Sequence, residues 1–261
     1  MPSYFFEEDH LYKIKGGLKI ALFLDFDGTL VPIQKDPAKC FLSEKVKELL
    51  RLITRSKYCY LSILSGRSLS DIRKRVGIRK IYYGRNHGLD ISGPAVRYTH
   101  PKALKAESII KGLKQQLKKE IKGIGSAWLE YKKFTLTLHF RSVKKEGIPF
   151  VKNIFDKTVA ESLEKKSLAV IKGKKVLELV PDVSWDKGKA VLWILQRLKD
   201  SCLPIYIGDD QTDETAFKAL GKRGITIRIG SSKRTFADYY LKGHWEVSQL
   251  LKQIQKVTNN I

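Results

Sequence analysis

The sequence predicts an α/β protein in which a doubly wound parallel-sheet core is interrupted by a smaller inserted α+β cap domain. Three observations support this fold class. Buried-strand and helical patterns alternate in the first part of the chain, an α-β-β-α-β-β order then replaces the alternation, and the alternation returns beyond Pro181. We therefore expect a core built from residues 1–98 and 182–261, with residues 99–181 as the inserted cap.

The first part of the chain carries strands and helices in turn. Apolar runs typical of strands buried on both faces occupy three segments, Lys19–Phe26, Tyr58–Leu64 and Ile81–Tyr83. Ser43–Arg55 has its apolar residues on one helical face, with Ser43 as the N-cap. A shorter helix over Leu69–Val76 would end at Gly77. This alternation is typical of a doubly wound parallel sheet.

The inserted segment and the last part of the chain follow different patterns. The insertion would contain, in order, a helix over Lys102–Ile121, strands over Ala127–Tyr131 and Phe134–Arg141, a helix over Phe150–Lys165, and strands over Leu168–Ile171 and Lys175–Val180 joined by a tight turn at Lys172–Lys174. Such an order cannot continue a parallel sheet, so it predicts a small antiparallel sheet with two helices on one face. The core then resumes with helices over Lys187–Leu198, over Thr212–Leu220 and from Trp245 onward, and strands over Pro204–Gly208 and Thr226–Ile229.

The chain is strongly basic. Its 50 Lys and Arg residues against 27 Asp and Glu give a formal net charge of +23. Such an excess is typical of nucleic-acid-binding proteins, but here the basic residues are spread along the chain and are densest in helical patterns such as Lys111–Lys122. We interpret them as a solvated helix face, and a basic surface would also attract an anionic substrate. Nucleic acid is therefore not the expected partner.

The sequence shows no feature of a membrane-bound, exported or disulfide-linked protein. No apolar run approaches the ~20 residues that span a bilayer. The N-terminus is acidic where an export signal would be basic. Cys40, Cys59 and Cys202 are an odd number and lie far apart, as expected of reduced, mostly buried thiols. We expect a cytoplasmic monomer.

Asp25 and Asp27 begin the hexapeptide Asp-Phe-Asp-Gly-Thr-Leu at the end of a buried strand. The carboxyl ends of such strands are where α/β proteins place their sites. One carboxylate could attack a phosphoryl group while its neighbour handles a proton, provided that a metal and cations neutralise the phosphoryl charge. A simple strand-to-turn corner would explain one Asp followed by Gly, but it explains this hexapeptide poorly.

Four acidic residues lie within six positions in Gly208–Glu214, directly after another apolar strand. They would repel one another unless a cation lies among them, and such hard oxygen ligands suit Mg²⁺. A favourable helix N-terminus would explain Asp213 and Glu214. It would not explain the pair Asp209 and Asp210.

Two weaker signals complete the set. Ser65-Gly66-Arg67 follows the strand Tyr58–Leu64 and offers a hydroxyl and backbone N–H groups near a helix start, where phosphate binds well, although any strand-to-helix turn could have this sequence. Lys187 opens a helix, where a cation opposes the helix dipole. Neutralising phosphoryl oxygens would explain it, and an ordinary surface lysine is the simpler alternative.

These four pieces, in this order, resemble the haloacid dehalogenase (HAD) superfamily of phosphatases, whose core is a Rossmann-like sheet. Within it the chain resembles the trehalose-6-phosphate phosphatase family over about residues 19–250. The segments that carry the narrower resemblance are Leu64–Ile72, Asn86–Gly88, Glu130–Lys132, Leu138–Arg141, Val176–Pro181, Asp186–Gly188 and Gly208–Phe217. GDDxTDExxF is specific to that family and its near neighbours, whereas DxDGT marks only the superfamily.

The resemblance implies a role for each matching residue. Asp25 would be the nucleophile and Asp27 the acid that protonates the leaving sugar oxygen and later activates water. Ser65 and Lys187 would hold the phosphoryl oxygens. Mg²⁺ would be bound by Asp25, the backbone carbonyl of Asp27 and Asp209, with Asp210 or Asp213 in support. The residues implied to bind substrate are Thr29 and Arg67, then Asn86 and His87 beside the cap, and Glu130, Lys132, Arg141 and Glu178 in the cap, which would act as a specificity lid.

Several alternatives stay open. Glu130 and Lys132 flank a hairpin and could be an ordinary exposed cross-strand set, and His139 could be a packed strand residue. Arg85 stands where glycine is expected, so the loop either bends differently or gains a substrate contact. The activity implied is Mg²⁺-dependent hydrolysis of trehalose 6-phosphate through an aspartyl-phosphate. The alternative is a HAD phosphatase for another sugar phosphate, such as sucrose phosphate or a glycosyl-phosphoglycerate.

Overall fold

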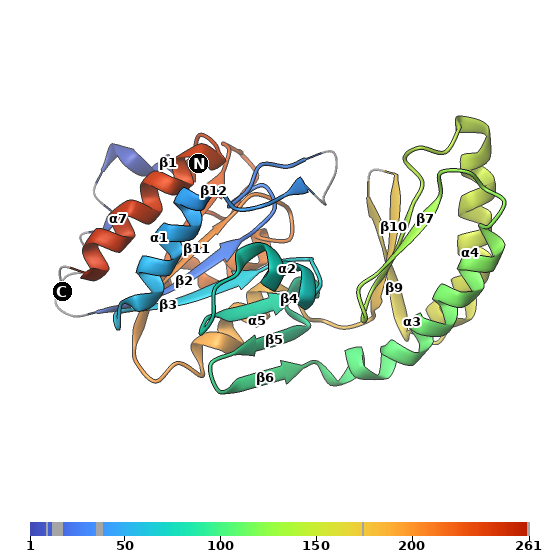
Figure 1. Cartoon of the computed structure of the whole chain (residues 1–261), viewed down its shortest axis with the longest axis horizontal. Coiled ribbons are helices and arrows are strands. Elements are labelled where there is room, and N and C mark those ends of the chain that lie inside the picture. Colours follow the sequence, from blue (N-terminus) through green and yellow to red (C-terminus); the bar gives the residue numbers. More distant parts are fainter. Residues whose placement is uncertain (9, 12–17, 35–38, 174, 260–261) are drawn as a thin grey trace. The chain divides into compact units, whose positions relative to one another are not determined.

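The chain divides into two units, one formed by Met1–Tyr98 with Trp185–Ile261 and the other by Thr99–Ser184. The structure is a computed structural model that describes residues 1–8, 10–11, 18–34, 39–173 and 175–259 (Figure 1). Each unit has its own sheet, with one hydrophobic core on each face of the first sheet and one core in the second unit. Two separately packed units in one chain explain why the α-β pattern of the sequence changes twice.

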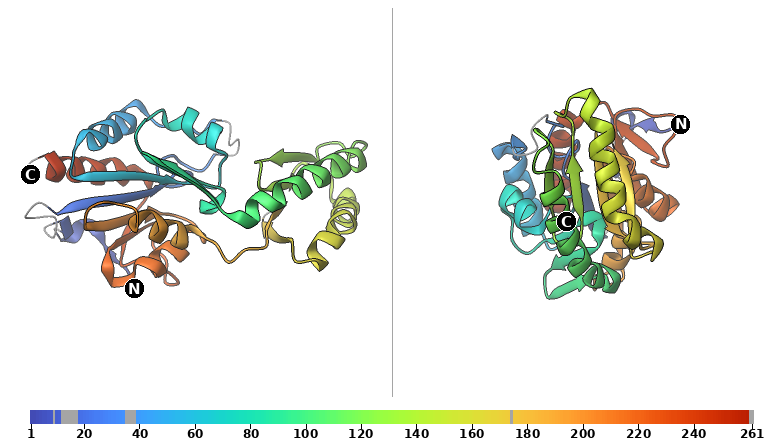
Figure 2. Two further views of the ribbon diagram at one scale, coloured as in Figure 1. Left: turned by 90° about the horizontal axis from the view of Figure 1, so that it is seen from below. Right: turned by 90° about the vertical axis from the view of Figure 1, so that its right-hand side faces the viewer.

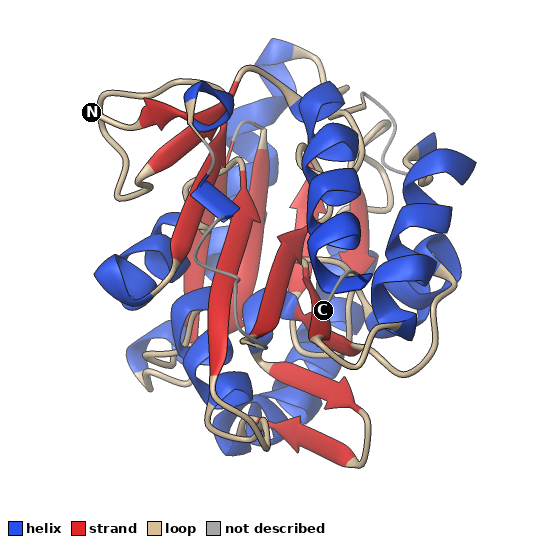
Figure 3. Cartoon of the chain, turned by 90° about the vertical axis from the view of Figure 1, so that its left-hand side faces the viewer, coloured by secondary structure: helices blue, strands red, loops and turns tan. Residues whose placement is uncertain are grey.

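The sheet of the first unit is mainly parallel. Among the described residues its strand order is β1-β13-β12-β11-β2-β3-β4-β5-β6, and Figure 3 shows these strands side by side between helices. The strands are β1 (Ser3–Tyr4), β2 (Lys19–Asp25), β3 (Cys59–Leu64), β4 (Tyr82–Arg85), β5 (Asp90–Gly93), β6 (Val96–Thr99), β11 (Cys202–Gly208), β12 (Ile225–Ile229) and β13 (Tyr239–Leu241). All pairs from β1 to β4 are parallel, so the carboxyl ends of β2, β3 and β11 lie at one edge.

Helices cover both faces of this sheet. One face packs against α1 (Glu44–Arg55), α2 (Leu69–Val76) and α7 (Val247–Asn259), and the other against α5 (Lys187–Leu195) and α6 (Glu214–Leu220). In the left view of Figure 2, the blue, cyan and red helices lie on one side of the strands and the orange helices on the other. Residues of β2 alternate between the two cores, Leu22 and Leu24 facing one and Phe23 the other. Burial on both faces explains the continuous apolar run, and the doubly wound fold class is confirmed.

The second unit is a four-stranded antiparallel sheet with two helices. Its elements are α3 (Pro101–Glu120), β7 (Trp128–Tyr131), β8 (Leu136–His139), α4 (Ile148–Glu164), β9 (Leu168–Gly173) and β10 (Val176–Pro181), with strand order β7-β8-β10-β9. The pairs β7–β8, β8–β10 and β10–β9 are all antiparallel. Leu136, Leu138, Leu177 and Leu179 form one core with residues of both helices. The predicted α+β insertion is therefore confirmed as a fold.

The differences from the predicted elements lie at edges and ends. The sequence patterns do not predict the short strands β1, β5, β6 and β13, and β4 and β5 pair antiparallel at the edge of an otherwise parallel sheet. The last helix begins at Val247 rather than Trp245, because a 3₁₀ turn over His244–Glu246 precedes it. Strand β9 extends to Gly173, so the β9–β10 turn falls later than predicted, and Lys174 lies outside the described residues.

The two crossings between the units leave from a shared aromatic contact on the first unit. The ring of Tyr98, the last residue before the second unit, lies 5.2 Å from that of Trp185, the first residue after it, and 4.8 Å from Trp193. The indole N–H of Trp185 donates to the carbonyl oxygen of Gly88 at 2.8 Å. Entry and exit of the insertion are therefore fixed to one point of the core.

The described part of the chain contains neither a disulfide nor a helix that could span a membrane. Cys40 and Cys59 are buried, Cys202 is half-buried, and none of the three forms a disulfide. No described helix is long and apolar enough to cross a bilayer.

Candidate active site

Asp25 and Lys187 form a buried ion pair at the carboxyl edge of the parallel sheet. Asp25 ends β2 and Lys187 is the first residue of α5, with only 5% and 2% of their surfaces exposed. Lys187 Nζ donates to Asp25 Oδ1 and to Asp213 Oδ1, both at 2.7 Å. Asp186 caps α5 by accepting the backbone N–H of Lys189, which fixes the start of the helix and thus the lysine. The cation at this helix start is therefore no surface residue.

Asp213 organises the loop after β11. Its Oδ1 also accepts the Tyr206 hydroxyl at 2.6 Å, and its Oδ2 accepts the backbone N–H groups of Asp209 and Asp210 at 3.0 Å each. An added Cβ at Gly208 would lie 2.3 Å from Asp213 Cγ, so only glycine allows this approach. With both oxygens occupied, Asp213 acts mainly as the centre that shapes the loop.

Asp209 lies against the loop that follows β2. Thr29 Oγ1 donates to Asp209 Oδ1 at 3.3 Å. Gly28 has a φ of +87°, and a Cβ there would lie 2.0 Å from Asp209 Oδ2. Gly28 is required both for the backbone turn and for the carboxylate that packs on it.

The charges of this cluster do not balance. Asp25, Asp209 and Asp213 each offer an oxygen within 4.8 Å of the others, against the single ammonium of Lys187. Burial raises the pKa of Asp25 well above its ordinary value, Lys187 opposes the rise and Asp213 adds to it. Burial, Asp213 and Asp210 raise the pKa of Asp209 to about 6. Surplus negative charge among hard oxygen donors fits a divalent cation such as Mg²⁺.

Lys187 stays charged in this setting. Burial lowers the pKa of its ammonium, but attraction from Asp25 and Asp213 outweighs the burial and leaves the pKa above its ordinary value. The ammonium is thus secured, and the surplus negative charge falls on Asp25 and Asp209.

Asp27 is held by Arg67 in a two-point ion pair. Arg67 Nε and one terminal nitrogen donate to the two carboxylate oxygens of Asp27, both at 2.6 Å. The other terminal nitrogen donates to Asp71 at 2.8 Å, and Arg75 binds Asp71 in turn. The guanidinium also lies 5.4 Å from the ring centroid of Phe26. Arg67 is thus fixed from three sides.

The loop after β3 and the loop after β4 meet. The buried Ser65 hydroxyl accepts the backbone N–H of Arg67 at 3.1 Å, and the ring of His87 packs so closely on Gly66 that a Cβ there would be 3.0 Å from it. Asn86 and His87 have φ values of 47° and 59°, a strained turn. His87, a candidate for binding the sugar, therefore lies beside the loop of Ser65, a candidate for binding the phosphoryl group.

Arg85, where glycine was expected, is buried and forms an ion pair with the buried Asp90 on β5. Asp90 lies directly opposite Arg85 in the β4–β5 pairing. The pair closes the base of the Asn86–Gly88 turn, so the charge of Arg85 is used inside the protein.

Asp210 serves its own loop. Its Oδ1 accepts the N–H of Thr212 at 2.8 Å, the Thr212 hydroxyl at 2.6 Å and the N–H of Asp213 at 3.3 Å. Burial raises its pKa, but Lys187 and the Thr212 bonds leave the pKa below its ordinary value. The buried Glu214 beyond it binds Arg228 at 2.7 Å and the backbone N–H of Phe236 at 2.8 Å. These two residues stiffen the acidic loop.

The cap candidates form a separate cluster on the second unit. Lys132 Nζ lies 3.6 Å from Glu130 and 3.7 Å from Glu178, and His139 Nε2 lies 3.0 Å from Glu130 Oε2. Burial raises the pKa of Glu130, but His139 and Lys132 outweigh it and leave the pKa below its ordinary value. Arg141 is exposed just beyond β8. His139 is thus a partner of the cluster rather than a packing residue alone.

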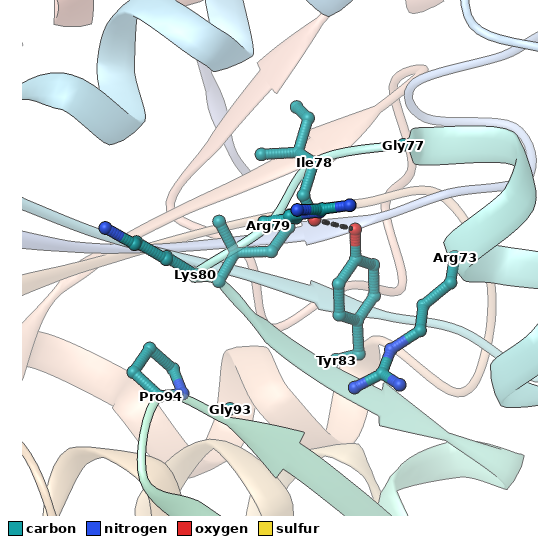
Figure 4. Close-up of a pocket in the computed structure, with 9 residues that line it drawn as sticks. Arg73, Gly77, Ile78, Arg79, Lys80, Tyr83, Gly93 and Pro94 are labelled. Atoms are coloured by element: carbon teal, nitrogen blue, oxygen red, sulfur yellow. Dashed lines mark hydrogen bonds between the residues drawn. The ribbon is translucent and has the colours of Figure 1, made fainter.

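A pocket of about 660 Å³ lies elsewhere on the first unit (Figure 4). It is near the start of β4, at the opposite end of that strand from Asn86. The exposed cations Arg73, Arg79 and Lys80 line it around Tyr83, whose hydroxyl donates to Ile78. None of the residues predicted for the site lines this pocket.

Sequence reasoning missed two supporting residues. Tyr206 is an aromatic hydroxyl in an otherwise aliphatic buried strand, and a buried tyrosine hydroxyl needs a hydrogen-bond partner. That signal could have linked it to the acidic residues that follow. Asp71, in the first turn of α2, lies four residues after Arg67, which directly precedes the N-cap Ser68, and this short separation lets the two side chains form an ion pair.

Comparison with known proteins agrees with this geometry. The trehalose-phosphatase family model matches residues 23–244. Trehalose-phosphate phosphatase B of Arabidopsis thaliana is 33% identical over 94% of this chain and 69% of its own length, and trehalose 6-phosphate phosphatase RA3 of Zea mays is 34% identical over 97% and 74%. A crystal structure of a trehalose-6-phosphate phosphatase related protein superposes with a TM-score of 0.78 over 92% of this chain and 99% of that chain, at 20% identity, which supports the fold. The chain belongs to the trehalose-phosphatase family of phosphoric monoester hydrolases.

Proposed function

We propose that this chain hydrolyses trehalose 6-phosphate to trehalose and phosphate, as a step of trehalose biosynthesis, through an aspartyl-phosphate on Asp25. The observation that carries the proposal is the buried cluster of Asp25, Asp209, Asp213 and Lys187 at the carboxyl edge of the sheet. The choice of trehalose 6-phosphate as substrate is based on relatives that are named trehalose-phosphate phosphatases.

A divalent cation suits this cluster. Asp25 and Asp209 would hold Mg²⁺, with the backbone carbonyl of Asp27 in support. Asp213, engaged by four donors, would act on the cation through the loop it shapes, and Asp210 would act likewise. When bound, Mg²⁺ offsets the negative charge of the phosphoryl group.

Asp25 performs the first transfer in this proposal. Its carboxylate oxygen not bonded to Lys187 attacks phosphorus, the bond from phosphorus to the sugar oxygen breaks, and the electron pair stays on that oxygen. Lys187 and Ser65, with Thr29, hold the phosphoryl oxygens. Water then attacks phosphorus in the acyl-phosphate, which releases phosphate and restores Asp25.

Asp27 gives a proton to the leaving oxygen and later takes one from water. Arg67 occupies both oxygens of Asp27 in the free protein. We infer that this pair opens when substrate binds, which frees Arg67 to meet an anionic oxygen and lets Asp27 take up a proton from water, the proton that it then gives to the leaving oxygen. Asp71 holds the guanidinium nearby during the exchange.

In this proposal the sugar is bound by side chains that lie outside the cluster of Asp25, Asp209, Asp213 and Lys187. We assign this role to Glu130, Lys132 and Glu178 on the cap sheet, with Arg141 as an exposed neighbour, and to Asn86 and His87 on the first unit. Carboxylates and an ammonium in one cluster can accept from and donate to sugar hydroxyls. Another sugar phosphate is the alternative substrate, because the phosphoryl chemistry would be the same.

The test is a phosphate-release assay on the full chain with Mg²⁺ over trehalose 6-phosphate, sucrose 6-phosphate and glucose 6-phosphate. We expect trehalose 6-phosphate to have the highest kcat/KM. Asp25→Asn should lower kcat by at least about 10³-fold, while Asp156→Asn, an exposed carboxylate on α4, should leave kcat unchanged. Both variants should stay folded, each with a cooperative thermal transition.

Each part of the proposal can fail separately. Substantial turnover by Asp25→Asn would exclude it as the nucleophile. A clear preference for another sugar phosphate would overturn the substrate and leave the class intact. Hydroxylamine-sensitive phosphate on the protein during turnover would support the acyl-phosphate. The cytoplasmic location, the monomeric state and the lack of nucleic-acid binding stay predictions, the latter two open to light scattering and DNA retention.

A further inference from the structure

The cap sheet has one covered face and one polar face. In β7 and β8, alternate residues point to opposite faces, and Leu129, Leu136 and Leu138 face the helices. Both helices, α3 and α4, lie on the same side of the strands (Figure 1). The opposite side, here called the polar face, carries Trp128, Glu130, Thr137, His139 and Glu178.

Trp128 is held flat on this face by His139. The two residues are direct cross-strand partners, and their rings stack with centroids 3.8 Å apart and planes 4° from parallel. His139 is fixed in turn by its 3.0 Å contact with Glu130. Trp128 nevertheless keeps 52% of its surface exposed, so one side of the indole lies on the imidazole and the remainder is open.

The same face of the sheet carries polar side-chain atoms without a hydrogen-bond partner among the described residues. Thr137 is 5% exposed, and its hydroxyl has no partner among the described residues. Glu178 Oε1 is buried without a hydrogen bond, and its nearest cation, Lys132 Nζ, is 3.7 Å away. Thr137 pairs with both Glu130 and Glu178 in the sheet, so all three side chains share the polar face. Buried polar atoms of this kind need a ligand or water to bind them.

The chemistry of this surface fits a neutral pyranose ring. A flat apolar platform suits the C–H face of the sugar, whose positive hydrogens meet the negative face of the indole. Carboxylates and a hydroxyl beside the platform suit the hydroxyls at the ring edge. Two carboxylates against the one ammonium of Lys132 disfavour an anion, so the phosphate end of the substrate is not the occupant.

We propose that Trp128 is a sugar-stacking residue that fixes the specificity of this enzyme for a glucosyl ring, and that His139 is the positioning residue that holds the indole and Glu130 in place. The inference rests on the proposed function, because the ring it describes belongs to the disaccharide phosphate. It adds to that function a hydrophobic contact that the ion cluster alone cannot supply.

The kinetic test compares two substrates. Trp128→Ala should raise KM for trehalose 6-phosphate about tenfold with kcat nearly unchanged, and it should leave kcat/KM for phenyl phosphate, which has no sugar, unchanged. Trp128→Phe should recover most of the KM. The matched control is Phe150→Ala, an exposed aromatic on α4 of the same unit, which should change neither substrate. His139→Asn should raise KM for the sugar substrate alone, as the alanine variant does.

A binding test uses trehalose itself, which carries no phosphate. In the full chain, the indole N–H resonance of Trp128, identified by its loss in Trp128→Phe, should shift saturably while that of the exposed Trp245 stays still. An unchanged KM in Trp128→Ala, or an equal loss on both substrates, would overturn the proposal. If the parent protein releases no phosphate from trehalose 6-phosphate, the proposed function fails, and the resonance then decides the stacking inference by itself.

Discussion

Gly28 tests whether the site depends on the close approach of Asp209 to the backbone. In Gly28→Ala the new Cβ would begin 2.0 Å from Asp209 Oδ2, whereas real Cβ contacts stay beyond 3.0 Å. The carboxylate must therefore retreat by about 1 Å, a displacement that costs about 10²-fold when it moves a catalytic group. The positive φ of +87° adds a separate cost of about 1–2 kcal/mol in folding free energy.

Gly230→Ala separates the two effects. Gly230 has a similar φ of +80°, and nothing lies within 4 Å of the position of an added Cβ. We expect both variants to lose about 2–8 °C in Tm, measured by scanning fluorimetry, from the shared backbone cost. Only Gly28→Ala should lose about 100-fold in kcat/KM for phosphate release. If its activity stays within about threefold of that of Gly230→Ala, the reasoning about Asp209 is refuted.

Two further predictions concern the charge cluster. The pKa of Asp209 rises from 3.8 to about 6 on folding. Between these two pH values the metal-free folded protein keeps a proton that the unfolded chain loses, so the free energy of unfolding should fall as pH rises from 3.8 to about 6. Because Mg²⁺ must displace that proton, the Tm gain from Mg²⁺ should grow as pH rises through about 6. A gain independent of pH, or one retained with the same pH profile in Asp209→Asn, would contradict the assignment. Asp213→Asn should lower the free energy of unfolding, measured with urea, by about 3–5 kcal/mol because it breaks one buried ion pair of Lys187. Tyr206→Phe removes only one hydrogen bond and should lower it by about 1 kcal/mol. Equal losses in the two variants would show that the ion pair contributes little.

Most of the fold could be predicted because the long elements have strong periodicity. The helix Leu69–Val76 was predicted with its bounds and its C-cap at Gly77, whose φ is +66°. The N-cap of α1 was also correct, since Ser43 accepts the N–H of Val46 at 3.3 Å. The strands that were missed are two to four residues long, too short to show a pattern, and are defined by their neighbours in the sheet. Edge pairing is a tertiary property that local sequence does not encode.

In the site, too, the positions of residues along the chain were predictable, whereas contacts between residues far apart in the sequence were not. Spacing predicted that Asp25 and Asp209 lie at strand ends, and the shared edge of a parallel sheet brings them together. Spacing could not predict that Arg67 would bind Asp27 rather than stand free, nor that Asp213 would be engaged by four donors. Those contacts join side chains 7 to 40 residues apart or come from backbone groups. The three-dimensional arrangement was needed to separate the carboxylates that we propose to hold a metal from those that shape the loop.

The order of the chain has a consequence for how the protein is made. The second unit is continuous, Thr99–Ser184, whereas β2 of the first unit pairs on one side with β11, which begins only at Cys202. On the ribosome the insertion is therefore complete while β2 still has an open apolar edge, the kind that chaperones protect. Lys187 emerges just ahead of β11, so Asp25 gains its cation and its neighbouring strand from one late segment. The residue order thus places the strand that flanks Asp25 after the lysine that binds it.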